Sequence, residues 1–225
     1  MIIAIDGPSG AGKSTLGKRL AKELGLLYLD TGAMYRAIGF AVVEAGASPE
    51  DAEKAIQIAG KSRIELSGEP EALHVWLDGR DVSPEIRTSK VSQAASIVST
   101  FPEVRRILVE RQRVLGNRGA GCVLDGRDIG TVVFPHADIK FFLTAKPESR
   151  AARRLEELKA KNTKANFEET LSEITERDER DASREDSPLS IAEDSIVIDS
   201  TELSAEEVFE QMLAAVREKQ RAQTA

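Results

Sequence analysis

The sequence predicts an α/β protein built on a parallel sheet, and three observations point to that fold class. Strand-like and helix-like segments alternate along most of the 225 residues, which is the order expected when helices connect parallel strands. A glycine-rich loop at residues 7–14 lies between the first expected strand and the first expected helix. In the middle of the chain, alternating apolar and polar residues indicate an antiparallel hairpin inserted into the parallel core.

The elements at the start of the chain follow from the spacing of apolar residues. The stretch IIAI at residues 2–5 predicts a strand, and the uncharged segment around it is too short for a signal peptide. The helix expected at residues 15–24 places Leu16, Leu20 and Leu24 on one face. The next expected elements are a strand at residues 26–30 and a helix at residues 33–45.

The middle of the chain predicts a helix and then the hairpin. The helix is expected to begin at Ser48 as its N-cap, with Pro49 in the first turn, and to run through residue 60. Residues 63–68 and 72–79 then predict two antiparallel strands with one half-exposed face. In the second strand the two alternating sets are Leu73, Val75 and Leu77 on one face and His74 and Trp76 on the other.

The second half of the chain predicts helices and strands in alternation. The expected helices lie at residues 93–101, 102–115, 147–161 and 166–180. The expected strands lie at residues 122–124, 138–144 and 195–199. A last helix is expected to begin with the capping box formed by Ser204 and Glu207.

The length allows one large domain or one domain with insertions, and the composition is that of a globular protein. A single domain spanning residues 1–225 is therefore expected. No apolar run approaches the roughly 18 residues that a membrane span needs. The net charge of −7 disfavours broad binding to nucleic acid or to anionic membranes. Cys122 is the single cysteine, so an internal disulfide framework is excluded and a cytoplasmic location is expected.

The strongest chemical signal is GPSGAGKS, which satisfies the pattern G-x-x-x-x-G-K-[ST] in the required context between a strand and a helix. Its glycines allow backbone N–H groups to face a bound phosphate, and the helix N-terminus adds a positive field. Lys13 can reach the outer phosphates, and the Ser14 hydroxyl can bind Mg²⁺. The residues expected to bind a nucleoside triphosphate are Gly7, Pro8, Ser9, Gly10, Ala11, Gly12, Lys13, Ser14 and Thr15.

The pentapeptide LDGRD occurs twice, at residues 77–81 and 124–128, in different contexts. The first copy follows an alternating strand, where Asp-Gly indicates a tight hairpin turn. The second follows a continuously apolar strand, so it is expected at the carboxyl end of a parallel sheet, where ligands bind. Since Asp-Gly is common in loops, the alternative is that both copies are turns. Asp125 is a candidate for orienting waters on Mg²⁺, or else a structural cap.

A triphosphate site fits a GTPase-like switch, an ATPase motor or a small-molecule kinase. The guanine-reading pattern N-K-x-D is absent, and the acidic chain shows no basic track for a polymer. A kinase needs several cations around the transferring phosphoryl group. The segment 147–184 supplies Arg150, Arg153, Arg154, Arg177, Arg180 and Arg184.

Within that segment, Arg177, Arg180 or Asp181, and Arg184 are expected on one helical face. The polar stretch at residues 159–166, between the two helices, is typical of a lid. The alternative is a solvated face of ion pairs. The acidic neighbours that favour this alternative are Asp178, Glu179 and Glu185.

These motifs together resemble the bacterial cytidylate kinases. The segments that carry the resemblance, in order along nearly the whole chain, are GPSGAGKST, LDTGAMYRA, SPEIRT, FPEVRRILVERQR, DGRDIGTVVFPHADIKFFLTA and ERDERD. The resemblance implies a three-layer P-loop fold with a five-stranded parallel sheet, an inserted monophosphate-binding subdomain and a helical lid. The implied core is residues 1–60, 103–146 and 185–225, with the insertion at about 61–102 and the lid at about 147–184.

The resemblance also implies the substrates ATP and CMP or dCMP, the cofactor Mg²⁺, and the residues that bind them. Matched residue by residue, the CMP-binding set is Thr31, Arg36, Ser96, Arg105, Arg127, Asp128, Arg177, Asp181 and Arg184. Thr31 stands where the family often has serine, and either hydroxyl can donate the same hydrogen bond. The implied catalytic cations are Lys13, Arg177 and one of the adjacent pair Arg153 and Arg154, which point about 100° apart on a helix. The implied metal site is Ser14 and, through water, Asp125.

Phosphoryl transfer to CMP needs no general base, because the acceptor phosphate is already ionised at neutral pH. His74 and His136 are accordingly interpreted as structural or surface residues. Two alternatives stay open, another P-loop small-molecule kinase of the UMP/CMP or shikimate type, and a non-kinase P-loop NTPase. We expect a monomer whose partners are small molecules, with no nucleic acid and no membrane.

Overall fold

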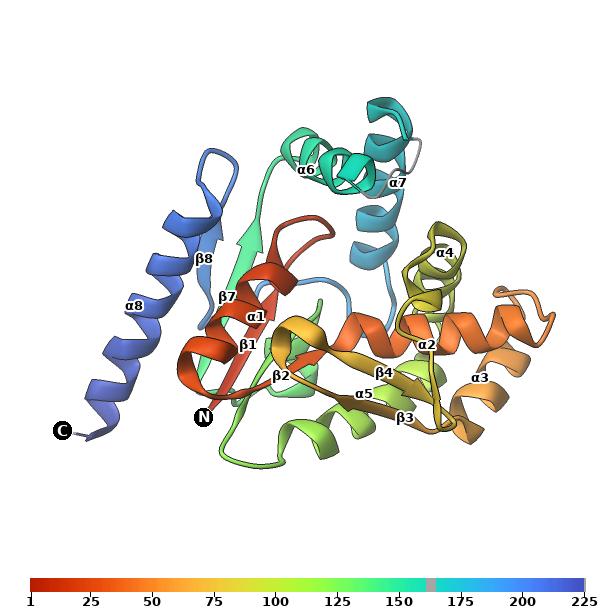
Figure 1. Ribbon diagram of the computed structural model, residues 1–225, viewed down its shortest axis with the longest axis horizontal. Helices are drawn as coiled ribbons and strands as arrows, with labels where there is room; N and C mark the ends of the chain where they lie inside the picture. The colour runs from red at the N-terminus through yellow and green to blue at the C-terminus, as the bar shows by residue number, and fades with distance from the viewer. Residues whose placement is uncertain (161–164, 225) are drawn as a thin grey trace.

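The computed structural model describes residues 1–160 and 165–224, and its core is a five-stranded sheet in which all neighbouring strands run parallel. The strand order is β2-β6-β1-β7-β8 (Figure 1). The strands are β1 (Ile2–Asp6), β2 (Leu27–Asp30), β6 (Cys122–Asp125), β7 (Ile139–Thr144) and β8 (Ile196–Asp199). The predicted α/β class and five-stranded parallel sheet are confirmed.

Helices cover both faces of this sheet, which explains why its central strands are apolar on both sides. The covering elements are α1 (Lys13–Leu24), α5 (Pro102–Gly116), the short π-helical segment η3 (Ile129–Val133) and α8 (Ala205–Thr224). On one face, α1 and α8 pack over Ile3 and Ile5. On the other face, α5 and η3 pack over Ala4 and Leu124. These residues are fully buried, so each face of the sheet has its own apolar core beneath the helices that cover it.

A smaller unit of helices and antiparallel strands lies on the opposite side of the molecule from α8 (Figure 1). Its elements are α2 (Thr31–Glu44), α3 (Ala52–Lys61), β3 (Ile64–Ser67), η1 (Pro70–Ala72), β4 (His74–Leu77), β5 (Arg80–Asp81), η2 (Glu85–Arg87) and α4 (Ser89–Val98). Its apolar interior includes Met34, Ile38 and Val75. Gly39 lets α2 and α4 approach closely, because a Cβ there would lie 2.7 Å from the Ala95 nitrogen.

The predicted hairpin is confirmed. β3 and β4 pair antiparallel, with Ile64 opposite Leu77. Val75 and Leu77 are buried while His74 is exposed, which is the alternation that the sequence predicts. β5 completes a three-stranded sheet by pairing with β4.

Two predicted helix starts are wrong. Ser48 is not the N-cap of its helix; the cap is Asp51, whose carboxylate accepts the Lys54 N–H, while Ser48 forms a preceding turn. The helix expected from residue 93 begins earlier, at Ser89, because the Thr88 side chain accepts the Val91 N–H. Both errors come from choosing among several possible caps close together in sequence.

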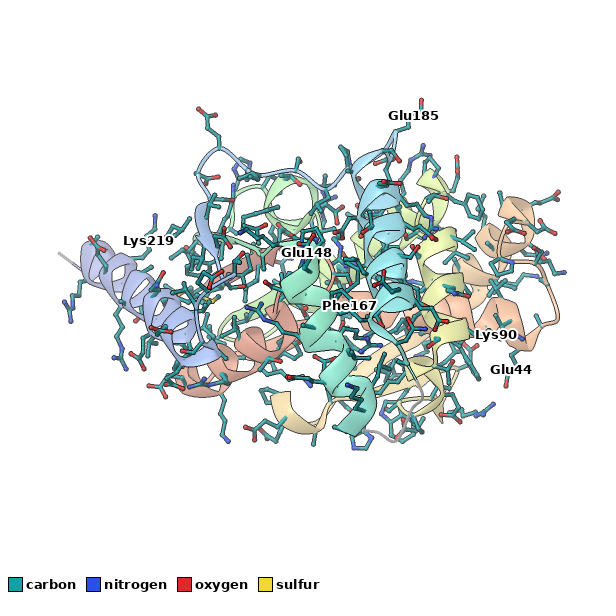
Figure 2. The ribbon with its side chains drawn as sticks, turned by 90° about the horizontal axis from the view of Figure 1, so that it is seen from above. Glu44, Lys90, Glu148, Phe167, Glu185 and Lys219 are labelled. Carbon is teal, nitrogen blue, oxygen red and sulfur yellow. The ribbon has the colours of Figure 1, made fainter. Side chains whose placement is uncertain are left out.

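Two helices, α6 (Pro147–Ala160) and α7 (Phe167–Ala182), pack against each other above the carboxyl ends of the strands (Figure 1). Seen from above, α7 runs between α6 and α4 (Figure 2). The prediction that Arg184 shares a helical face with Arg177 is wrong, because Arg184 lies beyond the end of α7. Part of the predicted lid stretch, residues 161–164, lies outside the described residues. Over the described ranges, no helix has the length and apolarity needed to cross a bilayer.

Candidate active site

A cavity of about 850 Å³ opens at the carboxyl ends of β1, β2 and β6, bounded by the glycine-rich loop, α2, α4 and α7. Every predicted site residue lines it except Gly7 and Pro8, which lie at the start of the loop. Residues separated by more than 100 positions in the sequence therefore meet at one place, as the end of a parallel sheet allows.

The glycine-rich loop has the backbone shape that its motif requires. Gly7 has φ +145°, and a Cβ there would lie 2.0 Å from the Leu143 carbonyl oxygen. Gly12, with φ +91°, caps the N-terminus of α1, so the helix begins at Lys13. Lys13 Nζ donates to the Pro8 carbonyl at 2.7 Å. Burial, followed by the positive charge of Arg127, lowers the pKa of Lys13 well below its usual range.

Asp125, at the end of β6, joins the loop to its neighbours. Its two carboxylate oxygens accept hydrogen bonds from Ser14 Oγ and the Tyr28 hydroxyl, both at 2.7 Å. Its carbonyl oxygen accepts from Thr31 Oγ1 at 2.6 Å. Burial and the nearby Asp30 carboxylate raise the pKa of Asp125. Tyr28 is a residue that the sequence interpretation missed, and only its place in a strand beside β6 reveals it.

The side of the cavity near α2 and α5 holds two ion pairs. Arg105 is 2% exposed, and its Nη2 donates to Asp128 at 2.5 Å. Arg36 pairs with Asp30 at 2.8 Å. Although burial opposes its ionisation, Arg36 and the Ala33 N–H lower the pKa of Asp30. The Asp30 carboxylate, next to the Arg36 guanidinium, is thus held charged at neutral pH.

Asp181 of α7 is the centre of an arginine cluster. Arg127 Nε donates to it at 2.7 Å, Arg184 also donates to it, and Arg177 lies 4.0 Å away. Burial opposes ionisation, but Arg127 and Arg184 lower the pKa of Asp181 to about 2. Burial and then Arg127 lower the pKa of Arg177 to about 10. In the described part of the chain, its Nε atom has no hydrogen-bond partner. One carboxylate therefore balances only part of the positive charge.

Several donors in the cavity wall have no hydrogen-bond acceptor among residues 1–160 and 165–224. The buried atoms without a hydrogen bond include the Nε atoms of Arg105, Arg177 and Arg184 and the hydroxyl of Tyr35. An unsatisfied buried donor costs roughly 1–3 kcal/mol, and more for a charged group. Donors left open in a cavity of this charge are suited to an anionic ligand with several oxygens.

Ser96 of α4 and Arg153 and Arg154 of α6 are in the wall but have protein partners. Ser96 Oγ accepts from Arg180 Nη1 at 2.6 Å, a contact between α4 and α7 that the sequence did not predict. Arg153 donates to the hydroxyl and the carbonyl of Ser200, whereas Arg154 pairs with Glu157 at 2.9 Å. The adjacent arginines thus point in different directions, as predicted.

The two LDGRD copies differ as predicted. In the first, Asp78 and Gly79 have positive φ values of 52° and 85° and connect the paired residues Leu77 and Arg80, which is a tight two-residue hairpin turn. None of its residues lines the cavity. The second copy supplies Asp125, Gly126, Arg127 and Asp128 to the cavity wall.

Comparison with known proteins identifies the family of the chain. A sequence model of the family described as cytidylate kinase matches residues 3–218. Curated relatives named cytidylate kinase include one from Caldanaerobacter subterraneus, 55% identical over 215 residues that cover 96% of this chain and 94% of the relative. Another, from Halalkalibacterium halodurans, is 46% identical over 219 residues that cover 97% of this chain and 98% of the relative.

A solved structure of an uncharacterized protein from Eubacterium ventriosum has a TM-score of 0.52 at 12% identity, covering 96% of this chain and 98% of that chain. That likeness concerns the fold alone. The family match over most of the chain and the two relatives, together with the phosphate loop and the arginine-lined cavity, give one conclusion: the chain belongs to the cytidylate kinase family.

Proposed function

We propose that this chain transfers the γ-phosphoryl group of ATP to CMP or dCMP, giving CDP or dCDP and ADP. The observation that carries the proposal is a single cavity in which a glycine-rich phosphate loop faces a buried carboxylate–guanidinium pair, Asp128 and Arg105. The loop suits a triphosphate and the pair suits the polar edge of cytosine. Membership of the cytidylate kinase family supports the same reaction.

ATP would bind to the loop at residues 7–15. The backbone N–H groups there and the N-terminus of α1 favour phosphate oxygens, and Lys13 would exchange its bond to the Pro8 carbonyl for a phosphate. A phosphate beside Lys13 would stabilise its positive charge, which burial disfavours. The apolar residues Leu203 and Val208 line the same cavity and would offer a surface for the base of ATP.

The residues at the end of the loop fit Mg²⁺. Ser14 Oγ and Asp125 Oδ2 are 2.7 Å apart, and among residues 1–160 and 165–224 no cluster of three or more acidic, His or Cys side chains could hold a metal alone. Mg²⁺ commonly takes one or two protein oxygens and fills its shell with waters and substrate phosphates. When bound, it would neutralise charge on the phosphate oxygens. Ser14 would bind it directly and Asp125 through water.

CMP would occupy the opposite part of the cavity, within reach of the nine predicted residues. Thr31, Arg36 and Arg127 would bind its phosphate, and Ser96 would contact the nucleotide from α4. Asp181 would accept a hydrogen bond from the sugar, because its pKa of about 2 keeps it an acceptor at neutral pH. In this arrangement the segment at about 61–102 would form the monophosphate-binding insertion, and α6 and α7 would supply the lid.

Transfer would depend on position and charge. The ionised CMP phosphate attacks the γ-phosphorus directly, so no side chain has to remove a proton. The positive charges that would surround the transferring group are Lys13, Arg127, Arg177, Arg184 and one of Arg153 and Arg154. Arg177 suits this role because it makes no hydrogen bond of its own in the described part of the chain. Its charge is therefore free to act on the charge that develops during transfer.

Hydrogen-bond polarity would select the base. Cytosine offers an amino donor at N4 beside acceptors at N3 and O2, which match the Asp128 carboxylate and the Arg105 guanidinium. Uracil would set its O4 against the carboxylate and its N3–H against the guanidinium. Each mismatch leaves a buried group unpaired at about 1–3 kcal/mol. CMP should therefore be preferred over UMP by roughly tenfold to several hundredfold in kcat/KM.

An ATP-coupled assay with CMP, dCMP, UMP, AMP and shikimate tests the proposal. We expect turnover on CMP and dCMP, weaker turnover on UMP and little on the others. Equal rates on CMP and UMP would favour a UMP/CMP kinase, and activity on shikimate alone would favour a small-acid kinase. ATP hydrolysis without any acceptor would indicate a non-kinase NTPase and contradict the proposal.

A further inference from the structure

Outside the residues assigned to ATP and CMP, an ion pair between a buried arginine and a half-buried aspartate contacts the phosphate loop from the side of the lid. Arg150 Nη1 of α6 lies 2.6 Å from Asp178 Oδ2 of α7, and Arg150 is only 3% exposed. A charge is rarely buried to this extent without a paired partner. Because desolvation offsets most of the attraction, a buried pair of this kind is weak evidence for stability. Its position in the molecule points to another role.

Both members of the pair bind the backbone of Ser9, in the phosphate loop. Arg150 Nη1 donates to the Ser9 carbonyl oxygen at 2.9 Å, and the Ser9 N–H donates to Asp178 Oδ1 at 3.4 Å. Arg150 Nε also donates to the Ala145 carbonyl at 2.9 Å, which ties the guanidinium to the end of β7. We call Arg150, Asp178 and the Ser9 backbone the loop clasp.

The local backbone makes room for the clasp. Gly10 has φ +76°, and a Cβ there would lie 3.2 Å from Arg150 Cβ. This glycine thus serves the contact with α6 as well as the curvature of the loop. The loop and α6 are fitted to each other at this point.

The clasp lies on the same helix as the residues proposed to act on the phosphates. Asp178 directly follows Arg177, and Asp181 comes less than one turn later. Elsewhere on α7, Arg180 donates to Ser96 of α4, and Asp181 accepts from Arg127. Over residues 178–181, α7 is therefore bonded to the phosphate loop through Asp178 and to the CMP side of the cavity through Arg180 and Asp181.

We propose that Arg150 and Asp178 are positioning residues that fix the Ser9 peptide and couple the phosphate loop to α7. This inference rests on the proposed function, in which neither side chain touches a substrate. Close packing transmits a shift of the loop to the helix, so Arg177 and Asp181 keep their places relative to the bound triphosphate. A misplacement of about 1 Å in such a site can lower the rate about 100-fold.

Kinetics of Asp178→Asn, Arg150→Met and the double variant test the coupling. Both substitutions preserve approximate volume, so folding is expected. Each single variant should lower kcat/KM for ATP by about tenfold, through kcat as well as KM, because the loop and Arg177 lose their alignment. Since the two side chains act through one contact, kcat/KM for ATP in the double variant should be no lower than in the less active single variant. A loss in the double variant equal to the product of the two single-variant losses would overturn the proposal.

Glu179→Gln is the matched control, since it makes the same change of charge at the next residue, which is exposed. Its kinetics should equal those of the wild type. A loss equal to that of Asp178→Asn would mean that the charge of the helix matters and that the clasp does not.

Hydrogen exchange of the nucleotide-free protein tests the clasp without the reaction. The peptide containing Ser9 should exchange faster in Asp178→Asn than in the wild type and Glu179→Gln, while β6 stays equally protected in all three. Unchanged exchange at Ser9 would refute the clasp even if CMP kinase activity is found. Faster exchange in a protein without that activity would support the clasp and refute the proposed function.

Discussion

The two copies of LDGRD place the same five residues in two environments. In the hairpin copy, the charged side chains bind nearby residues at the surface. Asp81 lies 2.7 Å from His74 Nδ1 and accepts a hydrogen bond from the Ser83 N–H at 2.9 Å. Arg80 bridges Glu44 and Glu85 with its side chain 55% exposed.

In the cavity copy, each charged side chain is bonded to a buried partner from another helix or strand. The pairs are Asp125 with Tyr28, Arg127 with Asp181, and Asp128 with Arg105. All of these side chains are largely buried. The difference teaches that the pentapeptide itself carries no function: the strand that precedes it and the elements around that strand's end decide what its charges do.

The arginines of the two copies give the largest expected contrast. Arg127→Ala should lower kcat/KM for CMP by about 10²–10³-fold, because it removes a cation from the cavity and one of the close partners of Asp181. Arg80→Ala removes exposed ion pairs and a cation–π contact with Phe40, so the free energy of unfolding should fall only slightly, with kinetics unchanged. Steady-state kinetics and urea unfolding of both variants provide the measurement. Similar kinetic losses at the two positions would show that the copies are functionally alike.

The last aspartates sharpen the contrast in base choice. Asp128→Asn should reduce the preference for CMP over UMP by about tenfold or more, since an amide can turn its N–H₂ group toward the uracil O4. Asp81→Asn should leave the preference as it is in the wild type, because Asp81 lies outside the cavity. The ratio of kcat/KM for the two nucleotides is the readout. An undiminished ratio in Asp128→Asn would mean that other residues read the base.

The glycines of the two copies are required for different reasons. In Gly126→Ala the new Cβ would lie 2.9 Å from Thr31 Oγ1 and 2.7 Å from Ile129 Cδ1, so KM for CMP should rise about fivefold as Thr31 shifts. Gly79 has open space around it but φ +85°. Gly79→Ala should therefore lower the free energy of unfolding by about 1–2 kcal/mol without a change in KM. If the two effects were exchanged, the assignment of site and turn would be wrong.

The smallest expected effect is a pH dependence at the hairpin. Hydrogen bonds from Ser83, and then from His74, lower the pKa of Asp81 to about 2. A carboxyl with a depressed folded-state pKa stabilises the protein above its unfolded value of about 3.9, and this stabilisation is lost as the pH falls toward 2. The difference in Tm between the wild type and Asp81→Asn should thus be constant above about pH 5 and narrow below pH 4. A constant difference throughout this range would contradict the role of the ionised carboxylate.

Much of the fold and part of the site follow from local sequence patterns. Apolar alternation predicts the hairpin, and Asp-Gly predicts its tight turn, because both depend on residues within a few positions of each other. The glycine-rich loop is predicted for the same reason. Where several caps compete within a few residues, as Ser48 and Asp51 do, the pattern is too short to choose between them.

The acidic neighbours of the lid arginines show that local sequence patterns do not predict which distant residue a side chain will bind. Asp178 could be a solvated ion-pair residue by its sequence, but in the fold it binds Arg150 and the Ser9 N–H. Tyr28 likewise has no signal of its own, yet it donates to a carboxylate 97 residues away. Such partners lie on different strands and helices, and nothing in their immediate sequence specifies which of them will be neighbours.

By itself, the sequence determined the α/β class, the phosphate loop and the distinction between the two pentapeptides, since each rests on short-range geometry of the backbone. Only the tertiary structure decided which charged side chains pair with each other. It placed Asp128 against Arg105, gathered three arginines around Asp181 and, among the residues that the structure describes, left Arg177 Nε without a hydrogen bond. The physical reason is that burial and the distance between charges fix both pairing and pKa, and both quantities exist only after the strands and helices have packed.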